Sequence, residues 1–155
     1  MNIFICLFYF LPFLRFSYTD LRWQKVNNNE IIAAWLIVSG IKVVVCPVQL
    51  IALNFLRSIC VLGILMLIVI ISESIRDKYL FGGGDIKLIS LLTWTFDSRT
   101  VLFSICLGCI FAIIFLLINK FFINSKTTAI PFIPFLTSGL LFSLVLQHFF
   151  LFSKI

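Results

Sequence analysis

Two aspartates occupy unusual places in a chain with few acidic residues. The 155-residue sequence contains only six Asp and Glu side chains, and Asp20 and Asp85 each follow a long apolar run. Two carboxyl groups held side by side cannot both ionise cheaply, so one of them keeps a proton. The ionised member can then take a proton from water while its protonated partner polarises a carbonyl, which is the chemistry of an aspartic protease. The pair therefore predicts peptide hydrolysis, provided that the fold unites the two acids.

Asp85 follows three consecutive glycines, Gly82, Gly83 and Gly84. Glycines permit a positive φ and let a substrate backbone approach closely, which suits a catalytic loop. The same residues also have a structural interpretation, because an aspartate here could cap the free N–H groups of residues 86–88 at the start of a helix. The sequence leaves both roles open for Asp85.

The composition is typical of a membrane protein. The chain is 62% hydrophobic and 12% charged, whereas a soluble domain has about 25% charged residues. We therefore expect an all-α polytopic membrane helix bundle that forms one integral-membrane domain over residues 1–155. Membrane lipid is an expected partner. Nucleic acid is not, because the basic residues behind the net charge of +6 lie in short clusters beside apolar runs.

The lengths of the apolar runs predict about six transmembrane helices. The first run has no cationic start and no small-residue cleavage site, so we expect a retained short span rather than a removed signal peptide. Residues 31–71 would form a helix of about 60 Å and must cross twice, with a turn in the region from Pro47 to Arg57. The run after Asp85 is about 16 Å long if helical, which predicts either a thin-membrane helix or one buried among its neighbours. The expected spans are 3–17, 31–46, 55–72, 86–96, 101–119 and 132–152.

The basic residues predict the orientation. With the amino terminus outside, eight of the 12 Lys and Arg residues lie on the cytoplasmic side and four on the other, as the positive-inside rule favours. Lys42 and Arg57 would lie near a turn and snorkel to the interface. Two crossings separate Asp20 from Asp85, so both acids emerge on the cytoplasmic face. Two further crossings return the segment 130–136 to that face, where its prolines suit the first turn of a helix.

Three segments together resemble the short form of the type IV prepilin (leader) peptidase family. Gly82-Gly83-Gly84-Asp85 resembles the GxGD motif of that family, and Asp20-Leu21-Arg22 through Val26-Asn27 resembles its first aspartate motif. Ile130-Pro131-Phe132-Ile133-Pro134-Phe135-Leu136 resembles its late proline-phenylalanine signature. Presenilin-like proteases share GxGD, so the specificity lies in the ordered combination, which covers residues 15–140.

The resemblance implies an aspartic endopeptidase of the bacterial inner membrane that acts at the cytoplasmic membrane face. Its substrates would be type IV prepilins or type II secretion pseudopilins, whose basic leader is cut after a glycine. No metal or organic cofactor is expected, and S-adenosylmethionine would serve only if the amino-terminal methylation known in many members is retained. Lys87 could favour the ionised form of Asp85 or bind lipid phosphate. The catalytic residues would be Asp20 and Asp85, with Gly82, Gly84, Lys87, Pro131, Phe132, Pro134 and Phe135 in support.

Departures from the family pattern leave two other functions open. Val26-Asn27-Asn28 stands where the family usually has Ile-Pro-Asn, and the paired CxxC zinc motifs of longer members are not seen. Cys106 and Cys109 lie within an apolar run, so we expect them to pack rather than to bind zinc. One alternative is an inactive or non-enzymatic membrane component of a pilus or secretion apparatus. The other is a presenilin-like intramembrane protease, which predicts acids deep within the spans rather than at their ends.

Overall fold

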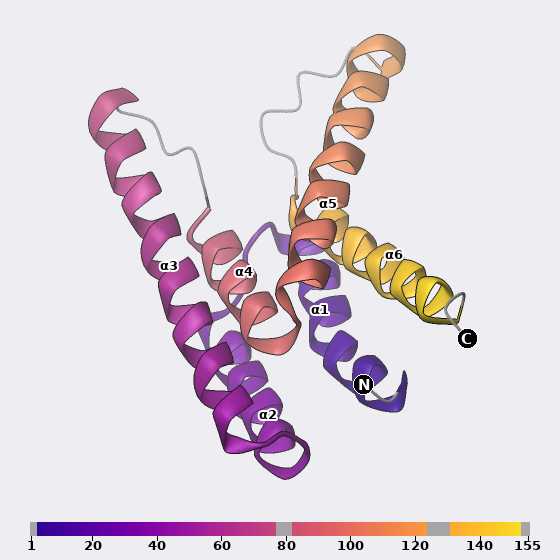
Figure 1. Cartoon of the computed structure of the whole chain (residues 1–155). Coiled ribbons are helices and arrows are strands. Elements are labelled where there is room, and N and C mark those ends of the chain that lie inside the picture. Colours follow the sequence, from indigo (N-terminus) through magenta and orange to yellow (C-terminus); the bar gives the residue numbers. More distant parts are fainter. Residues whose placement is uncertain (1–2, 77–81, 124–130, 153–155) are drawn as a thin grey trace. The chain divides into compact units, whose positions relative to one another are not determined.

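The computed structural model describes residues 3–76, 82–123 and 131–152 (Figure 1). Over these ranges the chain forms six α-helices and one short π-helical segment and contains no strand, so the prediction of an all-α protein is confirmed. The chain divides into two compact units, the first made of residues Met1–Gln24 and Ser98–Ile155 and the second of Lys25–Asp97.

The first unit contains the two ends of the chain. Its elements are α1 (Ile3–Trp23), α5 (Ser98–Ile118), the π-helical segment η1 (Asn119–Ile123) and α6 (Ile133–Phe152). Helix α6 packs against both α1 and α5. Helix α1 contributes buried aromatic side chains at helical spacing, among them Tyr9, Phe13 and Phe16. The rings of Phe13 and Phe16 meet edge to face at 6.4 Å between centroids, an arrangement that aromatic pairs favour.

Glycines let the backbones of α5 and α6 come close. A Cβ added to Gly139 would clash with the carbonyl oxygen of Ser104 and would lie 2.7 Å from the backbone nitrogen of Gly108. Small residues at such crossings are typical of membrane helix pairs, where close packing takes the place of a hydrophobic driving force. Gln147 also donates a hydrogen bond of 2.7 Å to the hydroxyl of Thr100. The crossing therefore fixes where α6 lies along α5.

The second unit contains α2 (Asn28–Val45), α3 (Val48–Arg76) and α4 (Gly83–Thr95). Only Cys46 and Pro47 separate α2 from α3, and the carbonyl of Pro47 accepts hydrogen bonds from Leu50 and Ile51 in the first turn of α3. The prediction of a turn that reaches Arg57 is therefore wrong, whereas the start of the span at residue 55 stays a prediction. Pro47 provides the break, because a proline fits just before a helix, whereas the polar residues up to Arg57 continue α3 without interruption.

Helix α4 is short and buried. Its residues from Leu88 to Thr95 are all buried, as are Ile86 before them and Phe96 after them. Of the two alternatives left open by its length, burial among its neighbours is the one confirmed, with α3 and α2 packed against it. The helix begins at Gly83 rather than at residue 86. The glycines therefore form its first turn, where the backbone N–H groups have no intrahelical partner in any case.

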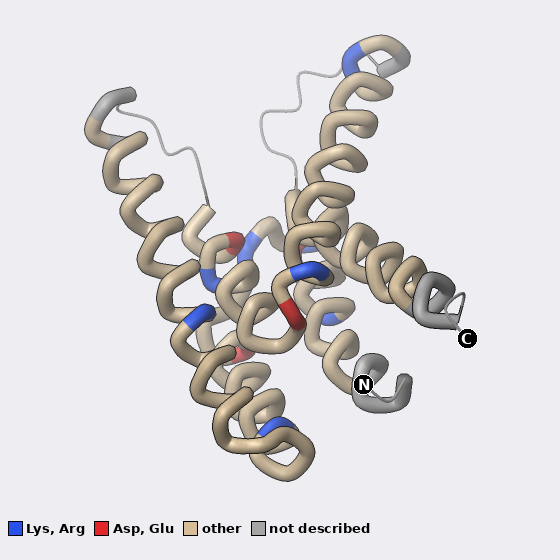
Figure 2. Tube along the Cα trace, in the orientation of Figure 1, with Lys and Arg blue, Asp and Glu red and all other residues tan. Residues whose placement is uncertain are grey.

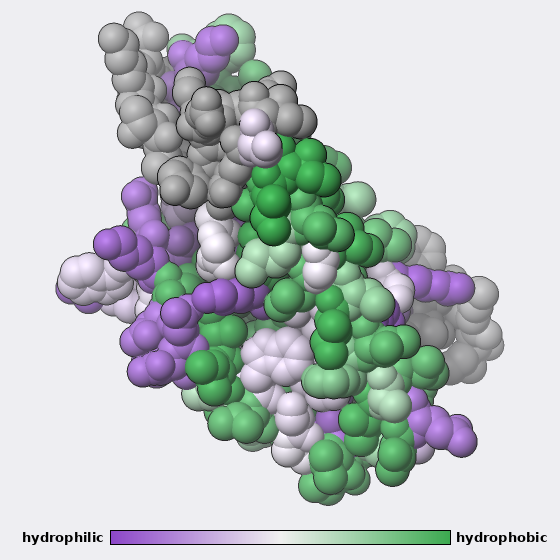
Figure 3. All heavy atoms as spheres, turned by 90° about the vertical axis from the view of Figure 1, so that its left-hand side faces the viewer, coloured by the Kyte–Doolittle hydropathy of each residue, from purple (hydrophilic) through white to green (hydrophobic). Residues whose placement is uncertain are grey.

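Three helical segments in the described part of the chain are long and apolar enough to cross a membrane: Asn28–Val45, Val48–Ser72 and Ser98–Phe121. Charged residues occur at only a few positions along the described helices (Figure 2). Large apolar side chains are exposed along α3, and hydrophobic residues cover much of the face that Figure 3 turns toward the viewer. These features are those of a membrane protein. Crossings by α1, α4 and α6 stay predictions.

Candidate active site

Asp20 lies in the last turn of α1 and is buried, with 7% of its surface exposed. Its carboxylate oxygen Oδ2 accepts a hydrogen bond of 3.2 Å from the backbone N–H of Ile133, the first residue of α6. The first N–H groups of a helix lack intrahelical partners and carry partial positive charge, so they attract a carboxylate. The carboxyl group of Asp20 thus connects the end of α1 to the start of α6 within the first unit.

The proline-phenylalanine segment makes this contact possible. The carbonyl of Phe132 accepts hydrogen bonds from the N–H groups of Phe135 and Leu136, so α6 starts directly after Phe132. Pro131 precedes the helix and Pro134 occupies its second position, where a missing N–H removes no helical hydrogen bond. The expected opening of a helix by these prolines is confirmed. The helix start leaves the N–H of Ile133 free to bind Asp20.

Burial raises the pKa of Asp20 above its ordinary value, because removal from water penalises the charged form. The hydrogen bond from Ile133 acts in the opposite direction but is the smaller influence. Asp20 lies beyond the apolar run 3–17, at the end of α1. Burial therefore favours the protonated form of this carboxyl group, which is the form that the acid of an aspartic dyad needs.

Asp85 is the third residue of α4 and is half-buried. The residue before the helix is Gly82, so the prediction that Asp85 itself caps the helix is wrong. Gly82 has a φ of −69°, and no described glycine adopts the positive φ that glycine permits. The carboxylate instead lies back over Gly82, where an added Cβ would come within 3.3 Å of Oδ2 of Asp85. A negative charge in the first turn is favoured by the helix dipole.

Residues from the end of the first aspartate motif pack beside the GxGD motif. A Cβ added to Gly84 would meet the side chain of Val26 at 3.9 Å. Lys87, which is half-buried, donates a hydrogen bond of 2.7 Å from Nζ to Oδ1 of the exposed Asn28. The sequence suggested Asp85 or lipid phosphate as the partner of Lys87, and Asn28 is neither of these. Val26 and Asn28 hold the start of α4 to the start of α2 in the second unit.

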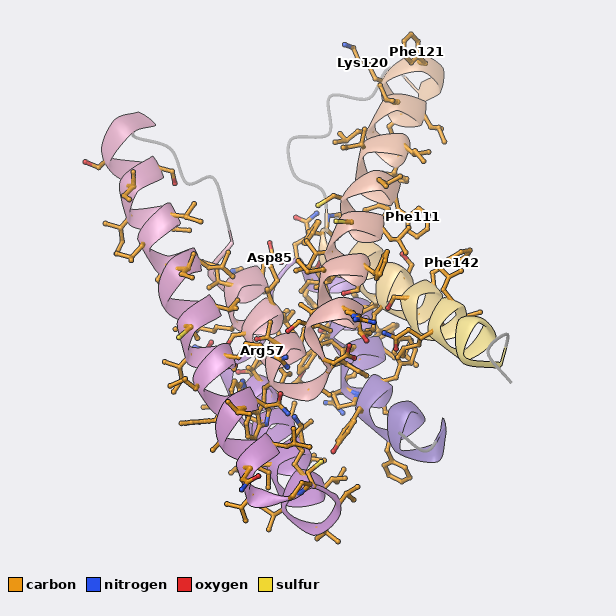
Figure 4. All side chains as sticks on the ribbon, viewed as in Figure 1. Arg57, Asp85, Phe111, Lys120, Phe121 and Phe142 are labelled. Carbon is orange, nitrogen blue, oxygen red and sulfur yellow. The ribbon has the colours of Figure 1, made fainter. Side chains whose placement is uncertain are left out.

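The other end of α4 is bound by two cations (Figure 4 labels Arg57 and Asp85). Lys42 of α2 is 3% exposed and donates a hydrogen bond from Nζ to the carbonyl oxygen of Trp94. The guanidinium of Arg57 on α3 donates to the carbonyl oxygens of Thr93 at 3.0 Å and Phe96 at 2.6 Å. The prediction that both side chains snorkel to the interface is therefore wrong. The presence of a basic residue within an apolar helix was the feature of the sequence that could have indicated such a bond to buried carbonyl groups.

The structure thus groups the predicted site residues into two sets. Asp20 lies with Pro131, Phe132, Pro134 and Phe135 in the first unit, and Asp85 lies with Gly82, Gly84 and Lys87 in the second. Pairing of Asp20 with Asp85 stays a prediction. Cys106 and Cys109 are exposed on α5, and the described ranges hold no group of three His, Cys, Asp or Glu residues that could bind a metal ion.

The described part of the chain thus combines three helices that can cross a membrane with a buried carboxyl group at the start of α6 and a second carboxyl group that follows a glycine run. Residues 5–117 match the type IV leader peptidase family. The chain belongs to this family. The matched range includes Asp20 and Asp85 and ends before the proline-phenylalanine segment. No curated protein and no solved structure shows significant similarity to the chain.

Family membership indicates a function of the leader-peptidase type, that is, hydrolysis of a peptide bond.

Proposed function

We propose that the protein is an aspartic endopeptidase that removes the basic leader from type IV prepilins or type II secretion pseudopilins, with Asp20 and Asp85 as its catalytic pair. The observation that carries the proposal is the burial of Asp20 against the first N–H group of α6. Because the proline-phenylalanine segment binds the buried carboxyl group of Asp20, we infer that this segment forms part of the active site. Family membership supports the same reaction class.

In the proposed reaction Asp20 is protonated and Asp85 is ionised. Asp85 takes a proton from water, the resulting hydroxide attacks the scissile carbonyl, and the proton of Asp20 stabilises the oxygen on which negative charge develops. The proton on Asp85 then passes to the leaving amine, and the peptide bond breaks. The raised pKa of Asp20 and the place of Asp85 in the first turn of α4 support this division of roles.

Chain connectivity supports the pairing of the two acids. Two helices long and apolar enough to cross a membrane, Asn28–Val45 and Val48–Ser72, lie between Asp20 and Asp85. An even number of crossings returns the chain to the face from which it started. In addition, Val26 follows Asp20 by only six positions and packs at Gly84, directly before Asp85.

The proposed site faces the cytoplasm from the bacterial inner membrane, as the distribution of Lys and Arg favours. A basic leader would be attracted both to anionic lipid and to an acidic site at that surface. The hydrolysis uses two carboxyl groups and water, so it needs no metal and no organic cofactor. S-adenosylmethionine would be required only if the protein also methylates the new amino terminus.

Co-expression with candidate prepilins tests the proposal. Leader removal is followed by the change in gel mobility, and sequencing of the new amino terminus is expected to place the cut after a glycine. Wild-type protein should process the precursor, whereas Asp20→Asn and Asp85→Asn should not. Full processing by either variant would remove that aspartate from the mechanism. A cut within a transmembrane segment of the substrate would instead favour an intramembrane protease.

Alanine substitutions within the glycine run should differ by position. In Gly82→Ala the new Cβ would lie 3.3 Å from Oδ2 of Asp85 and displace the carboxylate, which should lower kcat about threefold to tenfold. Gly83→Ala is the matched control, because a Cβ there meets no atom within 4 Å. Steady-state kinetics on the two purified variants measures the difference. Equal losses in both would show that the space over Gly82 does not matter for Asp85.

A further inference from the structure

The structure assigns Lys42 and Arg57 a positioning role: we propose that they clamp the carboxyl-terminal end of α4 and thereby set the place of Asp85 at its other end. The proposal rests on the proposed function in one respect, namely that Asp85 acts in catalysis. The clamp itself is a structural claim about the second unit.

The length of α4 creates the need for a clamp. A helix of 13 residues is about 20 Å long, whereas the hydrocarbon core of a bilayer is about 30 Å thick. If Asp85 lies at the membrane surface, the other end of α4 must stop inside the membrane. The last carbonyl groups of a helix have no intrahelical partners, and no bulk water is available there to satisfy them.

Side chains of α2 and α3 satisfy these carbonyl groups. Arg57 donates hydrogen bonds to the carbonyl oxygens of Thr93 and Phe96, and Lys42 donates one to the carbonyl oxygen of Trp94. Two positive charges at this end also match the negative end of the helix dipole. The polar cost of ending α4 inside the membrane is thus met by cations, which explains why two charged residues lie within apolar helices.

Aromatic contacts hold the clamp in place. Nζ of Lys42 lies 4.6 Å from the ring centre of Trp94, within reach of a cation–π interaction. The ring of Trp94 stacks on Trp35 of α2 at 5.5 Å, and Phe55 of α3 meets it edge-on at 5.7 Å. Arg57 is further oriented by Asn54, whose Oδ1 accepts a hydrogen bond of 2.9 Å. Both α2 and α3 therefore contact the last turn of α4.

The clamp acts on Asp85 through the helix. Trp94 lies nine positions after Asp85, which corresponds to about 14 Å along a helix axis. A packed helix moves as a rigid element, so a shift of its clamped end moves Asp85 by a similar amount. A displacement of about 1 Å in a catalytic group can reduce the rate about a hundredfold.

The test compares Arg57→Met with Arg57→Lys and Arg99→Met in purified full-length protein. Arg57→Met removes the clamping charge, and Arg57→Lys retains the charge with fewer donors. Arg99 is exposed at the start of α5, so Arg99→Met controls for the loss of a basic residue. Arg57→Met should lower kcat about tenfold to a hundredfold with KM for a leader peptide changed less than about twofold. Arg57→Lys should be intermediate, and Arg99→Met should match wild type.

A second readout follows the position of α4 without reference to activity. A single cysteine is placed at Gly83, which is exposed, in a background whose five native cysteines are replaced by alanine. The rate of labelling by a membrane-impermeant thiol reagent should change at least about threefold with Arg57→Met, whereas a cysteine at Asn29 of α2 should label at an unchanged rate. If Arg57→Met does not yield folded protein, Lys42→Met and Arg57→Lys carry the same comparison.

The outcomes separate the two claims. Unchanged labelling of residue 83 in a folded clamp variant overturns the clamp, whether or not activity falls. A changed labelling rate in a protein that cleaves no leader peptide, even as wild type, supports the clamp and counts against the proposed function. A changed rate with unchanged kcat would show that α4 moves without consequence for Asp85, which overturns the positioning role.

Discussion

Replacement of Asp20 by asparagine should abolish peptide cleavage and, at neutral pH, raise the thermal stability of the protein. The activity should fall about a thousandfold or more, because asparagine cannot supply the proton that polarises the scissile carbonyl. The stability should rise because burial penalises the ionised form of Asp20, as its raised pKa indicates, while asparagine is neutral. An asparagine oxygen can still accept the hydrogen bond from Ile133.

The stability gain should depend on pH with a definite sign. A carboxyl group whose pKa is raised in the folded state contributes stability that is fully present below its unfolded pKa, here taken as 3.8, and is lost as pH rises through the folded pKa. The difference in midpoint temperature between Asp20→Asn and wild type should therefore be smallest below pH 3.8 and grow as the pH rises toward the raised pKa of Asp20. Thermal unfolding in detergent at several pH values measures it. A difference that shrinks with rising pH would contradict the assignment.

Asp20→Ala provides the control for the hydrogen bond. It removes the negative charge as asparagine does, but it leaves the N–H of Ile133 without the carboxylate oxygen that accepts from it. The buried donor should then cost about 1–3 kcal/mol. Asp20→Ala should therefore be less stable than Asp20→Asn at every pH, and equal stabilities would show that the contact with α6 contributes little.

Substitution of Gly139 by alanine should be strongly destabilising. The added Cβ would clash with backbone atoms of α5, at the carbonyl of Ser104 and 2.7 Å from the nitrogen of Gly108. Backbone atoms cannot rotate away as the end of a side chain can, so α6 must move off α5. We expect a loss of about 2 kcal/mol or more in the free energy of unfolding. The same movement displaces Ile133 from Asp20, so cleavage should fall as well.

Gly63→Ala is the matched control. Gly63 lies in α3, and a Cβ there meets no atom within 4 Å. Its replacement should stabilise the helix by about 0.5–1 kcal/mol, because alanine has the higher helix propensity. Denaturant titration in detergent compares the two variants. A Gly139→Ala protein as stable as Gly63→Ala would contradict the close crossing of α5 and α6.

The fold class and the membrane character were predictable because they depend on composition and on the lengths of apolar runs. The helix start after Phe132 was predictable as well, since a proline near a helix start is a local steric requirement. The hydrogen bond between this helix start and Asp20 could not be predicted from the sequence. The contact joins Asp20 to a backbone N–H 113 positions away, and no local pattern contains information about a partner at that distance.

The errors share a physical cause. The predicted turn up to Arg57 and the predicted snorkelling of Lys42 and Arg57 both assumed that charged residues avoid apolar surroundings. That assumption neglects hydrogen-bond acceptors that another helix can bring into the membrane, here the carbonyl groups at the end of α4. Asp85 was likewise placed at the cap because aspartate is a strong capping residue. The glycines before it extended the helix by a turn instead.

The initial rate of leader-peptide cleavage by purified protein tests the central claim most directly. Wild type, Asp20→Asn and Asp85→Asn are compared at equal amounts of folded protein, with thermal unfolding as the check on folding. We expect wild type to cleave after a glycine, and we expect the rate of each variant to be reduced at least about a thousandfold. Undiminished cleavage by either folded variant would contradict the assignment of Asp20 and Asp85 as the catalytic pair.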